Sequence, residues 1–181
     1  MHSYKQKIIT HHEKYSQILV KSKRLDYKKD MLHFKVRALD AGCGAGTYLC
    51  KNTIGMDISK KLIKEAKKRG LVLLGDLEAM PFKQGSFDLV YSFSTLYYLK
   101  KFKKVVDEVS FVLMPRGRFV FDHINLYNLK ALYYKIRYFR VPQFFITYSR
   151  LQKILLNFEF KIKKVEKGLR FVIDAQKLFK K

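Results

Sequence analysis

The chain has 181 residues, 48% of them hydrophobic and 29% charged, and its 38 Lys and Arg against 15 Asp and Glu give a formal net charge of +23. This length suits a single domain with an ordinary core, and the composition excludes an intrinsically disordered chain. No run approaches the roughly 18 apolar residues of a membrane-spanning helix and the first residues lack a signal peptide's apolar segment, so we expect a cytoplasmic protein whose basic surface attracts polyanions.

The first two thirds of the chain alternate strand-like and helix-like segments. We expect strands at 36–40, 53–56, 71–74, 87–91 and 118–121. Ser59 is expected to cap a helix that Gly70 ends, and the apolar stripe of a second helix is expected to stop at Pro115. The run Leu71-Val72-Leu73-Leu74 is apolar throughout, which is typical of a buried parallel strand.

The two ends of the chain complete a single expected domain. Residues 1–33 are predicted to form a helical cover, 34–122 the core, 123–150 a basic and aromatic lid over the substrate, and 151–181 a helix and a β-hairpin. Thr147 or Ser149 is expected to cap that last helix. Strands alternating with helices predict an α/β fold with a mostly parallel sheet, a C-terminal antiparallel hairpin strand and helices on both faces.

A glycine-rich turn follows the first expected strand, in the run Leu39-Asp40-Ala41-Gly42-Cys43-Gly44-Ala45-Gly46-Thr47. Glycines here permit positive φ and let the backbone approach a ligand closely. The spacing is G-x-G-x-G, and Thr47 stands where a dinucleotide fingerprint has its third glycine. Asp40, just before the loop, would repel a pyrophosphate but suits the ammonium group of an amino-acid ligand.

Two more acids follow the next two expected strands. Asp57 ends the second strand, where a carboxylate accepts hydrogen bonds from both hydroxyls of a ribose. Asp76 follows the third strand, where it can accept from the exocyclic amine of an adenine. Acids for an amine, a ribose and an adenine at three successive strand ends together describe S-adenosylmethionine, with its carboxylate near the amides of the glycine loop.

Five segments resemble the class I, Rossmann-like S-adenosylmethionine-dependent methyltransferases, in particular the ubiquinone- and menaquinone-biosynthesis group: LDAGCGAG, IGMDIS, GDLEAMPF, GSFDLVYS and LMPRGRFVF. The resemblance covers about residues 36–122. It implies a cofactor site made of Asp40, Ala41, Gly42, Cys43, Gly44, Asp57, Ile58, Asp76, Leu77 and Ser92. Within that site the glycine loop would bind the methionine end, Asp57 the ribose, and Asp76 with Leu77 the adenine edge.

The chain departs from this family at three places. The segment between the glycine loop and Asp57 is short, which implies a truncated first helix. Arg116 stands where the family usually has glycine, and Phe158-Glu159-Phe160 replaces the usual Gly-Phe. The compact first helix and the pattern DIS-x-x-LI also resemble, more weakly, the tRNA wobble-uridine methyltransferases, although their long substrate insertions have no room here.

The acceptor side is less well defined by the sequence. Ser92-Phe93-Ser94-Thr95 replaces the Asn/Asp-Pro-Pro-Tyr/Phe motif of exocyclic-amine methylation, and no cysteine lies near the fourth or fifth strand for a 5-methylcytosine mechanism. His123, just after the fifth strand, is a candidate base. Tyr97 and Tyr98 occupy the place where the family group often carries two histidines, and they are further candidates for catalytic or substrate contacts.

The expected function is methyl transfer from S-adenosylmethionine, without a metal, to a small molecule or lipid. One alternative is an RNA (tRNA) methyltransferase that uses the basic surface, because the run Tyr133–Arg140 mixes aromatic and basic side chains that stack and pair with bases. Another is a non-catalytic domain that binds nucleic acid or activates a partner. Association with anionic membrane surfaces is a further expectation. The two cysteines, Cys43 and Cys50, are too few for a disulfide scaffold and lack zinc-site spacing.

Overall fold

The computed structural model describes residues 3–15, 37–125, 128, 133, 143–167 and 170–179. Much of the expected N-terminal cover and most of the expected lid at 123–150 therefore lie outside the described residues.

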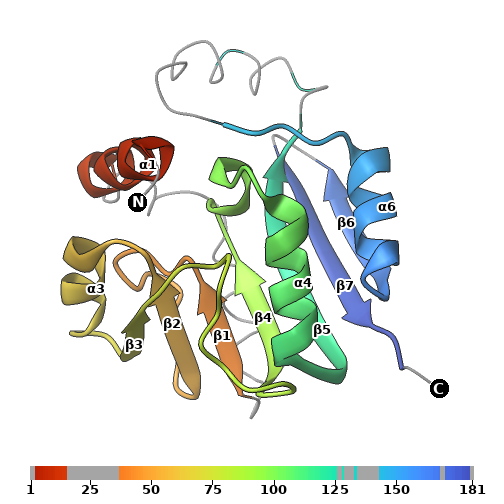
Figure 1. The fold of residues 1–181 in the computed structure, drawn as a ribbon, viewed down its shortest axis with the longest axis horizontal. Helices are drawn as coiled ribbons and strands as arrows, with labels where there is room; N and C mark the ends of the chain where they lie inside the picture. Colours follow the sequence, from red (N-terminus) through yellow and green to blue (C-terminus); the bar gives the residue numbers. More distant parts are fainter. Residues whose placement is uncertain are drawn as a thin grey trace.

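A seven-stranded sheet forms the centre of the molecule, in the order β3-β2-β1-β4-β5-β7-β6 (Figure 1). The strands are β1 (Ala38–Ala41), β2 (Thr53–Asp57), β3 (Leu71–Leu74), β4 (Phe87–Ser92), β5 (Leu113–Ile124), β6 (Phe160–Lys167) and β7 (Arg170–Lys177). The first five are parallel, whereas β7 runs antiparallel to both β5 and β6. The predicted parallel sheet with a C-terminal antiparallel hairpin is confirmed.

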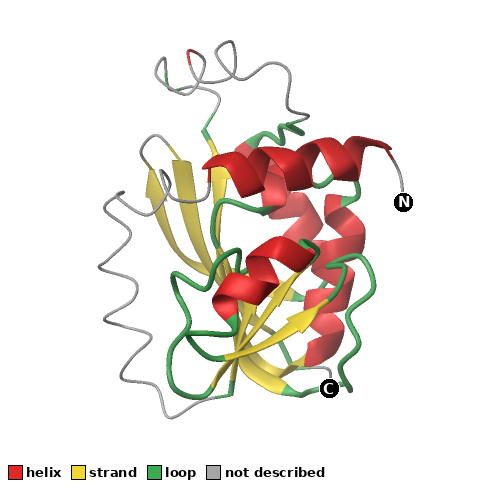
Figure 2. Ribbon diagram, turned by 90° about the vertical axis from the view of Figure 1, so that its left-hand side faces the viewer, coloured by secondary structure: helices red, strands yellow, loops and turns green. Residues whose placement is uncertain are grey.

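Helices lie on both faces of this sheet and across one of its ends. They are α1 (Ser3–Tyr15), α3 (Lys60–Ala66), the short 3-10 helix η2 (Leu96–Tyr98), α4 (Phe102–Val112) and α6 (Tyr148–Asn157). The connection through α3 moves outward from β2 to β3 and that through α4 moves the other way, from β4 to β5, so right-handed crossovers place the two on opposite faces. Figure 2, a view from the side, shows α1 lying across the top of the fold. None of the described helices is long and apolar enough to span a membrane.

The main core lies between the sheet and the pair α4 and α6, which stand next to each other in front of it in Figure 1. The predicted stripe of α4, with Val105, Val106 and Val109, is fully buried there. Leu151 and Leu155 of α6 fill the neighbouring space under the antiparallel strands. This packing fixes the position of β4, whose carboxyl end leads into the pocket.

Several local boundaries differ from the predictions. The helix capped by Ser59 ends at Ala66, four residues before Gly70. The second helix ends at Val112, and Pro115 lies inside β5 rather than at a helix end. Residues between β1 and β2 form turns without a helix, which agrees with the expected truncation. Thr147 rather than Ser149 caps α6, since its Oγ1 accepts a hydrogen bond from the N–H of Arg150.

The apolar strand β3 is not buried, contrary to its pattern. It is the outermost strand of the sheet, pairs only with β2, and leaves Leu71 67% exposed and Leu74 43% exposed. An all-apolar run indicates burial on both faces only when neighbouring strands and helices cover it. That condition depends on strand order, which the run itself does not encode.

Both departures from family glycines have a visible backbone consequence. Arg116 has φ of +64° and Glu159 has φ of +63°, in the left-handed region that glycine enters without strain. At both positions the chain keeps a turn geometry typical of glycine, and the Cβ of Arg116 and of Glu159 makes that geometry strained.

Candidate functional site

A pocket opens at the carboxyl ends of β1, β2, β3 and β4, where the strand order reverses between β1 and β4. Such switch points are where open α/β sheets bind ligands. The lining residues come from α1, the glycine loop, the ends of β2 and β3, α3 and the loop after β4: Lys5, Ile8, Ile9, Gly42, Cys43, Gly44, Ala45, Thr47, Tyr48, Asp57, Ile58, Ser59, Leu62, Gly75, Asp76, Leu77, Phe93, Ser94, Thr95, Tyr98 and Leu99.

The glycine loop forms one wall of the pocket. Gly42, Gly44 and Gly46 all have positive φ. The N–H groups of Gly42 and Cys43 donate to the Met56 carbonyl at 2.8 and 3.0 Å, which ties the loop to β2. A Cβ on Gly42 would lie 2.4 Å from Thr95 Cγ2, whereas a Cβ on Gly44 would meet nothing within 4 Å. The backbone at Gly44 therefore borders open space that a ligand can fill.

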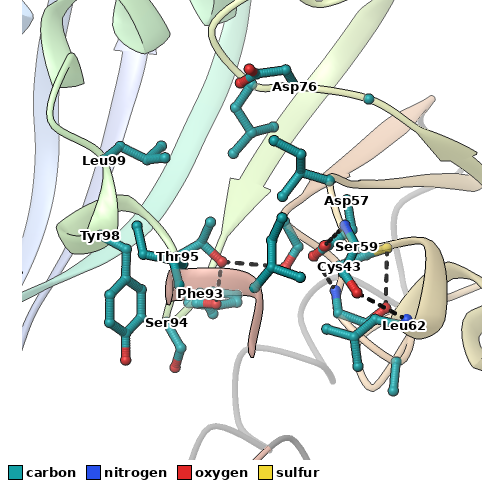
Figure 3. A pocket seen from close by; sticks show the side chains of 18 of the residues that line it. Cys43, Asp57, Ser59, Leu62, Asp76, Phe93, Ser94, Thr95, Tyr98 and Leu99 are labelled. Atoms are coloured by element: carbon teal, nitrogen blue, oxygen red, sulfur yellow. Dashed lines mark hydrogen bonds between the residues drawn. The ribbon is translucent and has the colours of Figure 1, made fainter. Parts of the chain in front are cut away.

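Asp57 links this loop to the start of α3. Its Oδ2 accepts a hydrogen bond from the N–H of Gly44 and its Oδ1 from the N–H of Ser59, each at 2.9 Å. The Ser59 hydroxyl in turn accepts from the N–H of Leu62 at 3.2 Å and caps α3. The carboxylate is thus held in one orientation at the edge of the pocket (Figure 3).

Asp76 lies at the far side of the pocket, in contact with α1. Its Oδ2 is 2.5 Å from Lys5 Nζ, and its Oδ1 accepts from the N–H of Glu78 at 3.0 Å. Partial burial opposes ionisation of Asp76, but the Lys5 ammonium and the Glu78 N–H outweigh it and lower the carboxyl pKa. Lys5 also lies 3.1 Å from Glu78 Oε2, so two acids hold α1 over the pocket.

Asp40 lies beneath the glycine loop, at the end of β1. It is 1% exposed, and its Oδ2 has no hydrogen-bond partner among the described residues. Burial, and then the charge of Asp57, raise the pKa of Asp40 well above its usual value. A buried carboxyl oxygen without a partner beside the loop fits a ligand that brings a positive charge, as the ammonium and sulfonium of S-adenosylmethionine do.

Comparison with known proteins gives a family for this arrangement. Residues 39–121 match the model of a methyltransferase domain, and this stretch contains the glycine loop, Asp57 and Asp76. This region is therefore similar to a methyltransferase domain, and the fold is the Rossmann-like one of solved methyltransferases. A solved S-adenosylmethionine-dependent methyltransferase of Thermotoga maritima shares its fold with a TM-score of 0.82 at 18% identity, over 97% of this chain and all of that one.

Two curated relatives are similar to part of this chain. One is a malonyl-[acyl-carrier protein] O-methyltransferase of Buchnera aphidicola, 34% identical over 112 residues, which are 55% of this chain and 45% of that protein. The other is the mitochondrial arginine-hydroxylase NDUFAF5 of Homo sapiens, 34% identical over 107 residues, which are 52% of this chain and 31% of that protein. The chain therefore spans less than half the length of either relative.

The structure brings most of the predicted cofactor residues to one pocket. Gly42, Cys43, Gly44, Asp57, Ile58, Asp76 and Leu77 all line it. Asp40, Ala41 and Ser92 instead lie behind the wall, where the Ser92 hydroxyl donates to the Ala41 carbonyl at 2.6 Å. Burial, and then the nearby acids Asp40 and Asp57, raise the pKa of the Cys43 thiol, so this cysteine is not a nucleophile.

The three acceptor-side candidates have different positions. Tyr98 lines the pocket, but Tyr97 and His123 do not. His123 is fully buried, with its ring 6.3 Å from that of Tyr97 and 6.0 Å from that of Phe102. Burial lowers the pKa of His123, so the ring stays neutral at pH 7. Its position behind the wall does not suit direct proton transfer from a substrate in this pocket.

Sequence reasoning missed the contribution of α1 to the pocket and a cation on β7. Lys5, Ile8 and Ile9 line the pocket although α1 precedes the glycine loop by more than 20 residues. Arg170 on β7 reaches the pocket wall at Ser94, which is 76 positions earlier in the chain. No sequence signal could have identified either, because each depends on how distant elements pack. Across the described residues, no group of three or more His, Cys, Asp or Glu side chains forms a metal site.

Proposed function

We propose that the methyltransferase domain transfers a methyl group from S-adenosylmethionine to a small-molecule or lipid acceptor. The observation that carries this proposal is the convergence of the glycine loop, Asp57 and Asp76 on one pocket at the switch point of the sheet. This proposal includes three predictions from the sequence: methyltransferase activity, a single domain over residues 1–181, and a cytoplasmic location.

Each part of the pocket has a role in holding the donor. Asp57 accepts hydrogen bonds from the ribose hydroxyls, and its fixed orientation means that little entropy is lost on binding. Asp76 and the neighbouring Leu77 hold the edge of the adenine. The loop amides bind the methionine carboxylate, and the positive charge of the donor favours ionisation of Asp40, whose pKa burial raises in the free chain.

The chain's contribution to chemistry is alignment rather than activation. When bound, S-adenosylmethionine supplies a methyl group that its sulfonium already activates. Ile8, Ile9, Phe93 and Leu99 form apolar walls that exclude water and restrict the approach of the acceptor. Positioning of this kind can lower a barrier by about 7–11 kcal/mol.

The two curated relatives support this proposal to different degrees. The name of the Buchnera protein describes methyl transfer to an oxygen, in agreement with the proposal. The name of the human protein describes a hydroxylation. Methyl transfer by this chain therefore needs a direct test, and the same test distinguishes an enzyme from a non-catalytic domain.

The test is titration calorimetry with S-adenosylmethionine and S-adenosylhomocysteine, followed by transfer of labelled methyl into metabolite, lipid and RNA fractions. We expect micromolar binding that Asp57→Ala weakens by about 100-fold, the scale of losing two hydrogen bonds to a charged group. Asp88→Ala is the control, because Asp88 pairs with Arg37 at the opposite end of β4. Absence of binding by the wild-type chain would overturn the proposal.

RNA is the second candidate acceptor, favoured by the surface of α3. Lys60, Lys61, Lys64, Lys67 and Lys68 are all exposed on or just after this helix, and Ser59 and Leu62 of the same segment line the pocket. A basic surface beside the donor site suits a phosphate backbone. This candidate requires tRNA binding that falls steeply with salt and labelled methyl in the RNA fraction. Label confined to metabolites or lipids would exclude it.

A further inference from the structure

A second cavity lies at the opposite end of the parallel strands from the pocket described above, near the tails of the β1, β2 and β4 arrows in Figure 1. Its volume is about 620 Å³, which is within the range of small-molecule sites. The residues that line it lie just before or at the start of β1, β2, β3 and β4, and no described residue lines both cavities. A ligand in the second cavity therefore leaves the first pocket free.

The lining of this second cavity is basic. Among the described residues it contains Arg37, Lys51 and Arg69 and no acid. Arg37 Nε lies 3.4 Å from Asp88 Oδ2, an oxygen that also accepts from the Arg37 N–H at 2.9 Å. Lys51 and Arg69 are exposed, and no side-chain hydrogen bond or ion pair with another described residue holds either of them. Asp88 balances one of the three cations, which leaves an excess of positive charge for an anionic ligand.

Apolar residues form another part of the lining. Phe82 and Phe87 pack edge to face, with ring centroids 4.9 Å apart and an angle of 88° between the rings. Ile54 and Leu71 line the same cavity. Leu71 is 67% exposed, so part of the apolar surface that β3 unexpectedly leaves open borders this cavity. Exposed apolar and aromatic side chains beside cations suit the flat face of a nucleobase.

The combination of cations and apolar surface narrows the class of ligand. A phosphate carries negative charge and several acceptor oxygens, which suit the ammonium of Lys51 and the guanidinium groups of Arg37 and Arg69. An inorganic anion leaves the apolar lining unused, and an uncharged apolar ligand leaves the cations unused. A nucleotide uses both, because a ribose separates its phosphate from its base. Asn52 lines the same cavity and has an amide that can donate to and accept from the edge of a base.

We propose that the second cavity binds a nucleotide, with the phosphate between Lys51 and Arg69 and the base against Phe82 and Leu71. The site anchors its ligand and does not expose it to the methyl donor, since the residues assigned to the donor lie at the other end of the strands. A free nucleotide and a strand of RNA present the same groups, and the experiment distinguishes them. The inference goes beyond the proposed function and does not depend on it.

Binding of simple probes to the full chain tests this inference. Uridine 5′-monophosphate, uridine and inorganic phosphate are titrated separately, and binding is followed by the backbone amide resonances. We expect the nucleotide to shift the amides of Asn52 and Gly70 and to leave those of Gly44 and Ser59 in place. Uridine and inorganic phosphate should each bind at least about tenfold more weakly, since each lacks one part of the ligand. Absence of nucleotide binding, equally tight binding of either fragment, or shifts confined to Gly44 and Ser59 would overturn the proposal.

Variants at exposed positions test the two parts of the cavity without disturbing the core. Lys51→Gln and Arg69→Gln should each weaken nucleotide binding about fivefold, the scale of one exposed ion pair. Leu71→Ala should weaken binding of the nucleotide but not of inorganic phosphate. Lys67→Gln is the matched control, because Lys67 is exposed and close to Arg69 in the chain but lines neither cavity. Equal losses in Lys67→Gln and Arg69→Gln would mean that the nucleotide responds only to overall charge, contrary to the proposal.

A longer ligand identifies the source of the nucleotide. If oligouridylate binds more tightly than uridine 5′-monophosphate and Arg69→Gln weakens it, the cavity holds a nucleotide of an RNA strand; if it binds no more tightly, the cavity holds a free nucleotide. Asp57→Ala should leave both affinities unchanged, since Asp57 belongs to the first pocket. A loss of nucleotide binding in Asp57→Ala would place the nucleotide in the first pocket and contradict the inference. Failure to bind S-adenosylmethionine with nucleotide binding intact would instead contradict only the proposed function.

Discussion

The two ends of the pocket are built in different ways. At the donor end, Asp57 bonds to Gly44 only 13 positions away and to Ser59 two positions away. At the other end, Arg170 reaches Ser94 and Asp122 across 76 and 48 positions. The first set of contacts comes from consecutive β-strand ends, while the second needs the C-terminal hairpin to pair with β5. Changes in that hairpin can therefore alter the end of the pocket near Ser94 without disturbing the end near Asp57.

Gly42→Ala should have the largest effect, because Gly42 is where the two ends touch. The Thr95 hydroxyl donates to the Gly42 carbonyl at 3.3 Å, and an added Cβ would lie 2.4 Å from Thr95 Cγ2 at a φ of +84°. We expect calorimetry to show donor affinity reduced by about 100-fold or more, from combined strain and displacement of both loops.

Gly44→Ala is the control for backbone strain alone. Gly44 also has positive φ, but its added Cβ would meet no atom within 4 Å. We expect this variant to lose less affinity than Gly42→Ala. If the two variants behave alike, strain rather than contact with Thr95 dominates, and the two ends of the pocket are less coupled than the structure indicates.

The difference between local and long-range contacts also explains which site residues could be predicted from the sequence. Asp57, Asp76 and the glycine loop were predictable, because each follows a strand whose apolar pattern is local and parallel strand ends share one edge. Lys5 and Arg170 were not, since nothing in their neighbours indicates which distant element they contact. Asp40 is an intermediate case, whose place at the end of β1 was expected but whose burial behind the loop was not.

Strand order caused the clearest wrong prediction. The run at Leu71–Leu74 was expected to be buried, yet β3 is the outermost strand and is largely exposed. The apolar run predicted the strand correctly, but burial of the strand depends on whether a further element lies beyond it. Sequence resemblance worked best at two unusual positions, because Arg116 and Glu159 replace family glycines and both have positive φ.

Asp40→Asn tests the donor end of the pocket. We expect this variant to raise the stability of the fold and to weaken donor binding. Because folding raises the pKa of Asp40, its contribution to stability is present below the usual carboxyl pKa near 4 and is lost as pH rises through the folded value. Asparagine cannot ionise, so we expect thermal unfolding at pH 7 to show a melting temperature about 2–4 °C higher, the scale of 1 kcal/mol in a domain of this size.

Donor binding by the same variant should weaken, since the negative charge that balances the ammonium is gone. At pH 4 the difference in melting temperature should shrink, as the wild-type carboxyl is then protonated. A variant less stable than wild type at pH 7 would mean that Asp40 is ionised and satisfied in the free chain, contrary to its buried, unpartnered oxygen.

Lys5→Met tests the part of the donor end that comes from α1. Lys5 contacts Asp76 and Glu78, and Met keeps the apolar stem while removing the charge. We expect hydrogen exchange within residues 3–15 to become about 3–10-fold faster at pH 7, the scale of losing one partly buried ion pair. Lys7→Met, at an exposed position on the same helix, should leave exchange unchanged.

The pH dependence of this contact has two limbs. The lowered pKa of Asp76 gives stability that is present above the usual aspartate value and lost as pH falls through the folded value. Burial opposes protonation of Lys5, but Asp76 and Glu78 outweigh it and raise its pKa, so its contribution is present below the usual lysine value and lost at higher pH. Protection of α1 relative to α6 should therefore be greatest from about pH 5 to 9. Protection independent of Lys5 at pH 7 would contradict this assignment.

Glu159→Gly should have the smallest effect and should leave both ends of the pocket unchanged. Glu159 has φ of +63°, and its carbonyl accepts from the N–H of Leu178 at 2.7 Å, a bond that glycine keeps. Relief of left-handed strain should stabilise the fold by about 0.5–1 kcal/mol, with donor affinity unaltered. Glu159→Ala separates this effect from loss of the carboxylate, because alanine keeps the strain.

Arg116→Gly should gain less stability than Glu159→Gly, since Arg116 also lies over the Phe179 ring at 4.9 Å. If Glu159→Gly unfolds at a lower temperature than Glu159→Ala, the positive φ is not a source of strain in this chain.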